Sequence, residues 1–237
     1  PLPAGPGLSM IPTKPMEESI LRERLIQLTR DLMLIESTDD RGSERLRCFQ
    51  LIRNHLEEVP GLEISMFEKC GYESLLALPV GVTRPEVLLC GHLDVVHHPE
   101  PDSYRSDVRE GRIFGPGAGD MKGQLAIMIE LMRNLGRECP GLSVGMVITS
   151  DEERGGENGV KYLVEDEGLR CGEAVIPDGG SLNDIIVEEK GIIHLKVTVS
   201  GVSAHAARPW LGVNALERLA GDLEKIKAYF DQGELET

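Results

Sequence analysis

Four short segments of this sequence carry a histidine or carboxylates at places where strands are expected to end. Their candidate residues are His92 and Asp94, then Asp120, then Glu152 and Glu153, and finally Asp178. Imidazole nitrogens and carboxylate oxygens together suit zinc, and also cobalt or manganese. A carboxylate next to such a site can also take a proton from an attacking water. The combination therefore indicates metal-assisted hydrolysis.

Each segment also has a plain structural interpretation. His92 could lie in an exposed turn at a strand end, and Asp120 could cap the helix that follows its glycine-rich stretch. The three consecutive acids of residues 151–153 could form a solvated turn, and Asp178 lies in Pro-Asp-Gly-Gly, a good turn sequence. The nearby pair of residues 97–98, both histidines, is expected in an exposed loop.

The elements that must position these residues follow from apolar spacing. Steps of three and four predict helices over residues 17–36, 43–58, 121–135, 159–167 and 214–230. Short apolar runs predict strands over residues 62–67, 75–79, 87–90, 142–149 and 174–176. Alternating apolar and polar residues predict a further strand over residues 192–200. Alternating strands and helices predict an α/β domain with a mostly parallel sheet flanked by helices. In such sheets, sites gather at the carboxyl ends of the strands.

Composition excludes several classes of function. The 25 Lys and Arg against 40 Asp and Glu leave a net charge of −15, which argues against nucleic acid as a partner. No apolar run approaches the roughly 20 residues that span a bilayer. Five cysteines, without a C-x-x-C motif, favour a reducing cytoplasm over a disulfide framework. Residues 1–15 are rich in Pro and Gly, lack the regions of a signal peptide and are expected to form a flexible tail.

Four motifs carry a resemblance to a known family. They are Gly-His-Leu-Asp-Val-Val from residue 91, Gly-x-Gly-x-x-Asp-Met-Lys-Gly from residue 115, Ser-Asp-Glu-Glu from residue 150 and Ser-Ala-His-Ala-Ala-Arg-Pro from residue 203. In this order they resemble the dinuclear zinc aminoacylase/carboxypeptidase family, which includes glutamate carboxypeptidase, acetylornithine deacetylase and succinyl-diaminopimelate desuccinylase. The resemblance runs from about residue 16 to the last residue.

The resemblance implies a role for each candidate residue. His92 and Asp178 would bind one metal ion, with Asp94 orienting the imidazole. Asp120 would bridge the two ions, and Glu153 would bind the second. Glu152 would be the general base.

The resemblance also implies how the chain is organised. Residues 16–190 would form the metal-binding catalytic domain, and residues 191–237 part of a smaller α+β lid that makes a homodimer. In that lid, His205 would stabilise the tetrahedral intermediate. The implied reaction is hydrolysis of the amide bond in N-acyl amino acids or small peptides, with two zinc ions per complete site.

One departure from the family leaves an alternative open. The family's last metal ligand is a histidine that follows the lid, and no histidine follows His205 here. The chain is therefore expected to be a truncated copy of a longer enzyme, or else a non-catalytic metal-binding or dimerisation module. A half-lid would expose the edge of the strand over residues 192–200, which predicts self-association.

Overall fold

The computed structural model describes residues 18–100, 103–179, 183–188 and 194–230. The chain divides into two compact units, Pro1–Asp184 and Ile185–Thr237. The expected tail over residues 1–15 lies outside the described residues. The expected domain boundary after residue 190 falls between residues 189 and 193, which also lie outside them, and it stays a prediction.

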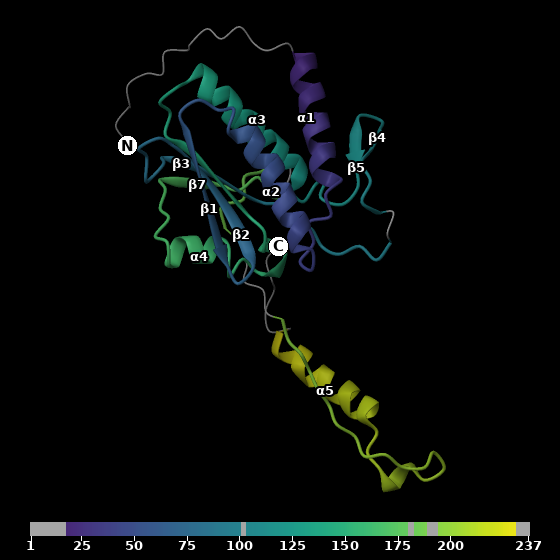
Figure 1. The fold of residues 1–237 in the computed structure, drawn as a ribbon. Coiled ribbons are helices and arrows are strands. Elements are labelled where there is room, and N and C mark those ends of the chain that lie inside the picture. The colour runs from purple at the N-terminus through teal and green to yellow at the C-terminus, as the bar shows by residue number, and fades with distance from the viewer. Residues whose placement is uncertain (1–17, 101–102, 180–182, 189–193, 231–237) are drawn as a thin grey trace. The chain divides into compact units, whose positions relative to one another are not determined.

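The first unit is built on a five-stranded sheet (Figure 1). Its strands, in spatial order, are β1 (Leu62–Lys69), β2 (Tyr72–Pro79), β6 (Val144–Thr149), β3 (Val87–His92) and β7 (Glu173–Val175). β3 pairs in parallel with both β6 and β7, whereas β2 pairs antiparallel with both β1 and β6. Within this sheet only β2 therefore runs against the other strands, which confirms the expected mostly parallel α/β fold.

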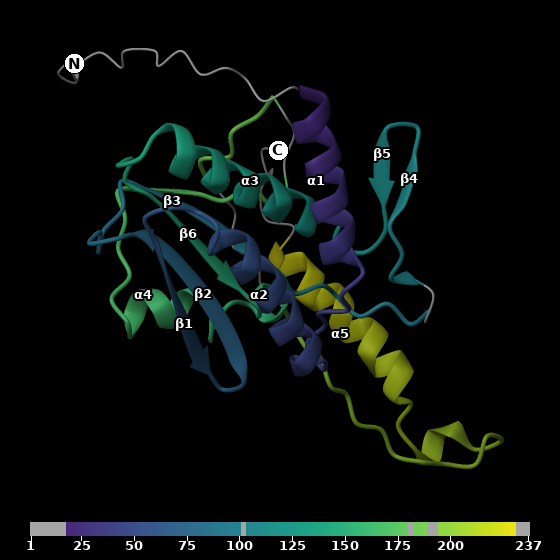
Figure 2. The ribbon, with the colours of Figure 1, turned by 45° about the horizontal axis from the view of Figure 1, so that its top comes forward.

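Helices cover both faces of the sheet (Figure 2). α1 (Glu18–Met33), α2 (Gly42–Leu56) and α3 (Lys122–Glu138) lie on one face, and the short α4 (Val160–Glu165) lies on the other. The strands supply both cores because successive side chains point to opposite faces. Leu89 faces the larger core under the three helices, while Leu88 packs with Leu163 of α4.

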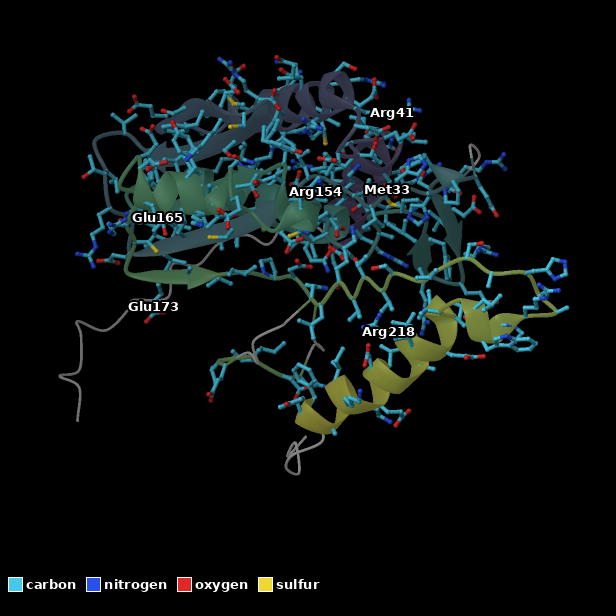
Figure 3. The ribbon with its side chains drawn as sticks, turned by 90° about the horizontal axis from the view of Figure 1, so that it is seen from below. Met33, Arg41, Arg154, Glu165, Glu173 and Arg218 are labelled. Atoms are coloured by element: carbon cyan, nitrogen blue, oxygen red, sulfur yellow. The ribbon has the colours of Figure 1, made fainter. Side chains whose placement is uncertain are left out.

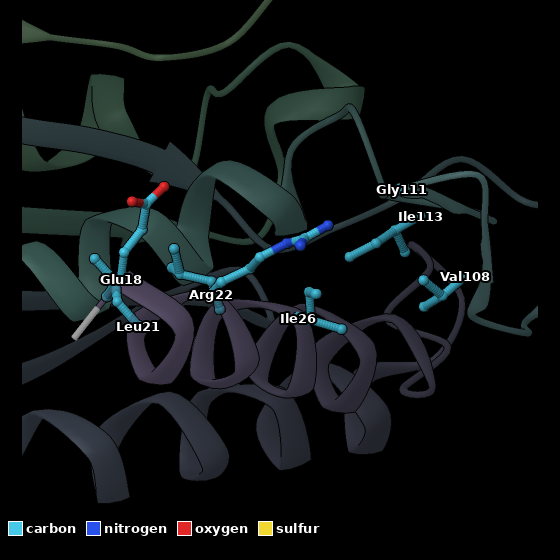
Figure 4. A pocket seen from close by; sticks show the side chains of 8 residues that line it. Glu18, Leu21, Arg22, Ile26, Val108, Gly111 and Ile113 are labelled. Atoms are coloured by element: carbon cyan, nitrogen blue, oxygen red, sulfur yellow. The ribbon is translucent and has the colours of Figure 1, made fainter.

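A small hairpin beside α1 was not predicted. β4 (Asp107–Arg109) and β5 (Arg112–Phe114) pair antiparallel around Glu110 and Gly111, whose φ angles are +51° and +74°. Two positive φ angles make the tight turn that suits a two-residue hairpin loop. The strands are short and charged, so alternation gave no signal. The hairpin and α1 together line a cavity of about 340 Å³, shown in Figure 4.

The second unit differs from expectation in its first half. Residues 192–200 were predicted as a strand, but the described part from residue 194 forms no strand. An extended segment becomes a strand only when a neighbour accepts its hydrogen bonds. In the described part of this unit the only such pairing is the single bridge between Val202 and Val213. The predicted helix is confirmed as α5 (Ala215–Phe230), and none of its described side chains is buried.

Across the described residues, no helix combines the length and the apolar character that crossing a membrane requires.

Helix α3 allows a matched test of the larger core. Ile129 is fully buried, whereas Ile127 on the same helix is 56% exposed. We expect Ile129→Ala to lower the free energy of unfolding by about 2–5 kcal/mol, because it removes buried methyl groups and leaves a cavity. Ile127→Ala should change it by less than about 0.5 kcal/mol. Urea unfolding of both variants measures the difference, and equal losses would contradict the assigned face.

Candidate functional site

The candidate site lies where three strands of the sheet end. His92 is the last residue of β3, and in the parallel register it pairs with Thr149, the last residue of β6. The segments after β3, β6 and β7 therefore leave the sheet at the same edge. Figure 3 shows Glu173, where β7 begins, toward one end of the sheet, and Arg154, beyond the end of β6, toward the other. The parallel register of the strands thus brings together candidate residues that are far apart in the sequence.

The imidazole of His92 is the centre of this site. Its side chain is 2% exposed, and its Nε2 atom faces three carboxylates from three separate segments. The distances from Nε2 are 3.0 Å to Asp120 Oδ1, 3.4 Å to Asp178 Oδ2 and 3.7 Å to Glu152 Oε2. Ligand-type atoms of His92, Glu152 and Asp178 all lie within 4.8 Å of one another. The arrangement therefore offers one nitrogen and several oxygens to a single point.

Asp94 occupies the other side of the imidazole. The Nδ1 atom of His92 lies 3.1 Å from the backbone carbonyl oxygen of Asp94 and 3.4 Å from its Oδ1. A donor bond from Nδ1 leaves Nε2 free to act as a ligand. The second carboxylate oxygen of Asp94 accepts the backbone N–H of Glu153 at 2.9 Å. Asp94 thereby fastens the turn after β6 to the turn after β3.

The electrostatics of the site reflect crowded negative charge. Burial raises the pKa values of Glu152, Glu153 and Asp178, and neighbouring carboxylates add to the rise. Burial alone would lower the pKa of His92, but Asp94, Glu152 and Asp178 outweigh it and raise that pKa to about 9. Buried Asp94 Oδ1 has no hydrogen bond among the described residues. A cation placed among these oxygens would relieve the repulsion, so the donor set fits a divalent metal ion.

Asp120 does not cap the helix that follows it. α3 begins at Lys122, and the capping position is held by Met121 without a side-chain hydrogen bond. The Asp120 carboxylate instead approaches Nε2 of His92. The preceding loop reaches this position through Gly115 and Gly117, whose φ angles of +139° and +77° suit glycine. The helix-cap interpretation is therefore wrong for Asp120.

The three consecutive acids after β6 have different environments. Asp151 is 1% exposed, and its Oδ2 accepts the backbone N–H groups of Asn158 at 2.7 Å and Gly159 at 3.0 Å. A Cβ atom on Gly159 would lie 2.2 Å from Asp151 Oδ1, so this loop closes only around a glycine. Asp151 therefore holds the loop, while Glu152 remains the acid that faces His92.

An open hollow of about 510 Å³ lies beside the site. Asp120 and Glu153 both line it, together with the glycine-rich loop and His98. His97 is exposed as expected, but His98 is partly buried and packs edge-on against Tyr104. The sequence offered no signal for His98, because the loop that carries it has no apolar periodicity.

His205 belongs to the second unit. It is exposed, and its Nδ1 accepts the backbone N–H of Ala207 at 3.2 Å. Its role in stabilising an intermediate stays a prediction, as do the individual roles of the other candidate residues.

Comparison with known proteins identifies relatives of this chain. A succinyl-diaminopimelate desuccinylase from Parvibaculum lavamentivorans is 30% identical over 167 residues, which cover 65% of this chain and 42% of the relative. An acetylornithine deacetylase from Proteus mirabilis is 28% identical over 218 residues, covering 87% of this chain and 55% of the relative. The chain thus spans about half the length of the curated relatives it matches.

The fold has counterparts among solved structures. Human carnosine dipeptidase 1 superposes with a TM-score of 0.56 at 21% identity, over 67% of this chain and 39% of the other. Residues 88–232, which begin within β3 and include every candidate site residue, match the peptidase family M20/M25/M40. The resemblance inferred from the four motifs is confirmed, and the chain belongs to the peptidase family M20/M25/M40.

Proposed function

We propose that this chain supplies the metal-binding and catalytic residues of a hydrolase that cleaves the amide bond of N-acyl amino acids or small peptides. The observation that carries the proposal is the buried imidazole of His92, with carboxylates of Asp120, Glu152 and Asp178 gathered around one nitrogen. The names of the relatives, a desuccinylase and a deacetylase, support the reaction class. Which acyl group and which amino acid the substrate of this chain contains is a question for the experiment below.

The proposed metal ligands divide between two ions. His92 and Asp178 would hold the first, Asp120 would bridge, and Glu153 would hold the second. No histidine follows His205 in this sequence, so the last ligand of the second ion is not assigned. Zinc suits this mixed set, and cobalt or manganese could replace it. A bound ion would lower the pKa of a water molecule and polarise the carbonyl of the substrate.

Glu152 is the proposed general base. Its side chain is 54% exposed, so a substrate could reach it, and its raised pKa makes its carboxylate a stronger base than an ordinary one. Glu152 would take a proton from the attacking water and pass it to the leaving amine. Asp94 would hold His92 in orientation, and His205 would donate a hydrogen bond to the developing oxyanion.

Assembly and compartment are also proposals. All five cysteines are free, which supports a reducing compartment, and we propose the cytoplasm. In the second unit, large apolar side chains such as Trp210, Leu216 and Phe230 are 73%, 76% and 54% exposed. Such surfaces favour association, and we propose that this unit forms a homodimer.

The ligand role of Asp178 can be tested by metal binding. We expect Asp178→Asn to weaken cobalt binding at least about tenfold, because one charged oxygen ligand is lost. The same change should raise the melting temperature of the metal-free protein. Burial, helped by Asp120 and opposed by His92, raises the pKa of Asp178 and so disfavours its ionised form. Titration followed by cobalt absorbance measures the affinity. Glu165→Gln, an exposed charge removal on α4, is the control, and equal affinity in both variants would contradict the role.

If Glu152 is the general base, its loss should reduce the rate of hydrolysis without reducing metal binding. Glu152→Ala should keep bound metal but lose about 10²–10⁴-fold in the rate of hydrolysis. The rates are measured on N-acetylornithine, succinyl-diaminopimelate and small dipeptides, with Glu157→Ala as the exposed control. Near-normal turnover would exclude Glu152 as the base. A wild-type chain that binds metal but hydrolyses none of these substrates would favour the non-catalytic module instead.

The dimer proposal concerns the exposed face of α5. Leu216→Asp should turn a dimer into a monomer, because a charge buried in an apolar interface is costly. Arg218→Asp is the control, since two residues along a helix place a side chain about 200° around its axis. Sedimentation velocity of wild type and both variants gives the result. A wild-type monomer at micromolar concentration would refute the proposal.

A further inference from the structure

The glycine-rich motif contains a lysine that the proposed chemistry does not use. Lys122 lies two residues after Asp120, and it is completely buried. Its Nζ donates hydrogen bonds to the backbone carbonyls of Leu32 at 3.0 Å and Ile35 at 2.7 Å. These carbonyls lie in the last turn of α1 and just beyond it, where the helix dipole favours a cation. Lys122 thus ties the start of α3 to the end of α1.

The same turn after α1 also holds the segment that follows β3. Ser37 is fully buried, and its hydroxyl donates to the carbonyl of Leu93 at 2.6 Å. The carbonyl of Ser37 accepts the backbone N–H of Val95 at 3.2 Å. Leu93 stands between His92 and Asp94 in the sequence. The turn from Ile35 to Ser37 is therefore hydrogen-bonded both to the segment that follows His92 and to the side chain of Lys122.

The stem of Lys122 adds a third contact between these segments. A Cβ atom on Gly117 would lie 2.9 Å from Lys122 Cδ and 3.1 Å from a methyl group of Val95. The backbone N–H of Lys122 also donates to the carbonyl of Gly117 at 2.8 Å. The packing is therefore tight where the glycine-rich loop meets the side chain of Lys122 and the segment after β3. A movement of either segment would change the distance between Asp120 and His92.

We propose that the turn formed by residues 35–37 is a clamp that sets the separation of His92 and Asp120 for metal binding, with Lys122 and Ser37 as its positioning residues. This inference rests on the proposed metal site. Neither residue reaches the candidate ligand atoms, so each acts through the backbone that carries a ligand. The expected consequence is a loss of metal affinity that exceeds any loss of folding.

Replacement of Lys122 by an unbranched apolar side chain tests the clamp. Lys122→Met in the 237-residue chain keeps the stem volume but removes the donor, and we expect cobalt affinity to fall about tenfold or more. Ser37→Ala removes only the hydroxyl and should lower the affinity several-fold. Lys161→Met, the same change at an exposed lysine of α4, should leave it unchanged. Cobalt absorbance titrations are run well below the melting temperature of each variant.

Each outcome supports or overturns the clamp. Weaker cobalt binding in folded Lys122→Met and Ser37→Ala supports it. Wild-type affinity in both folded variants overturns it while leaving the proposed function intact. If Lys122→Met does not fold, Ser37→Ala decides alone, and wild-type affinity in that variant overturns the clamp. A wild-type chain that binds no cobalt contradicts the proposed function, and the clamp with it.

Discussion

The concentration of negative charge around one buried imidazole is the constraint on which the rest of the structure depends. His92 is almost inaccessible, yet three carboxylates converge on its Nε2 atom. Carboxylates at such separations repel, and burial strengthens the repulsion. The fold must therefore hold these carboxylates in place against their mutual repulsion. It does so through the backbone, because each acid lies on a loop anchored at a strand or helix end.

Two of the acids in these motifs serve that anchoring. Asp94 accepts a backbone N–H from the turn after β6, and Asp151 accepts two from the loop before α4. A hydrogen bond from a backbone N–H to a carboxylate is stronger than one between neutral groups, so these bonds fix the geometry of the loops. Glu152, beside Asp151 in the sequence, is thereby left exposed enough to meet a ligand. Acids that are neighbours in the sequence thus have two roles. Some, such as Asp151, hold the loops in place, and others, such as Glu152, place a carboxylate near His92.

Local signals predicted most of the sheet and its helices, and long-range pairing explains where prediction failed. β3 was expected from its short apolar run, and α3 from apolar residues spaced three and four apart. The strand over residues 192–200 was expected from alternation, but a strand also needs a partner, and alternation cannot say whether one is present. The hairpin of β4 and β5 was missed because its strands are too short to show alternation. The tight turn at residues 110–111 brings the two strands together.

The sequence by itself determined the chemistry available to this protein. Residue types, together with their places after apolar runs or after a glycine-rich stretch, identified His92, Asp120, Glu152 and Asp178 as candidates. Side-chain chemistry and strand ends are local properties, so a sequence can show them. Only the tertiary structure decided which atoms meet. The parallel register of β3 and β6 sets the approach of Glu152 to His92, and the burial of Lys122 against the end of α1 depends on contacts about 90 residues apart in the chain. Such contacts arise from packing of whole elements, which no short window of sequence contains.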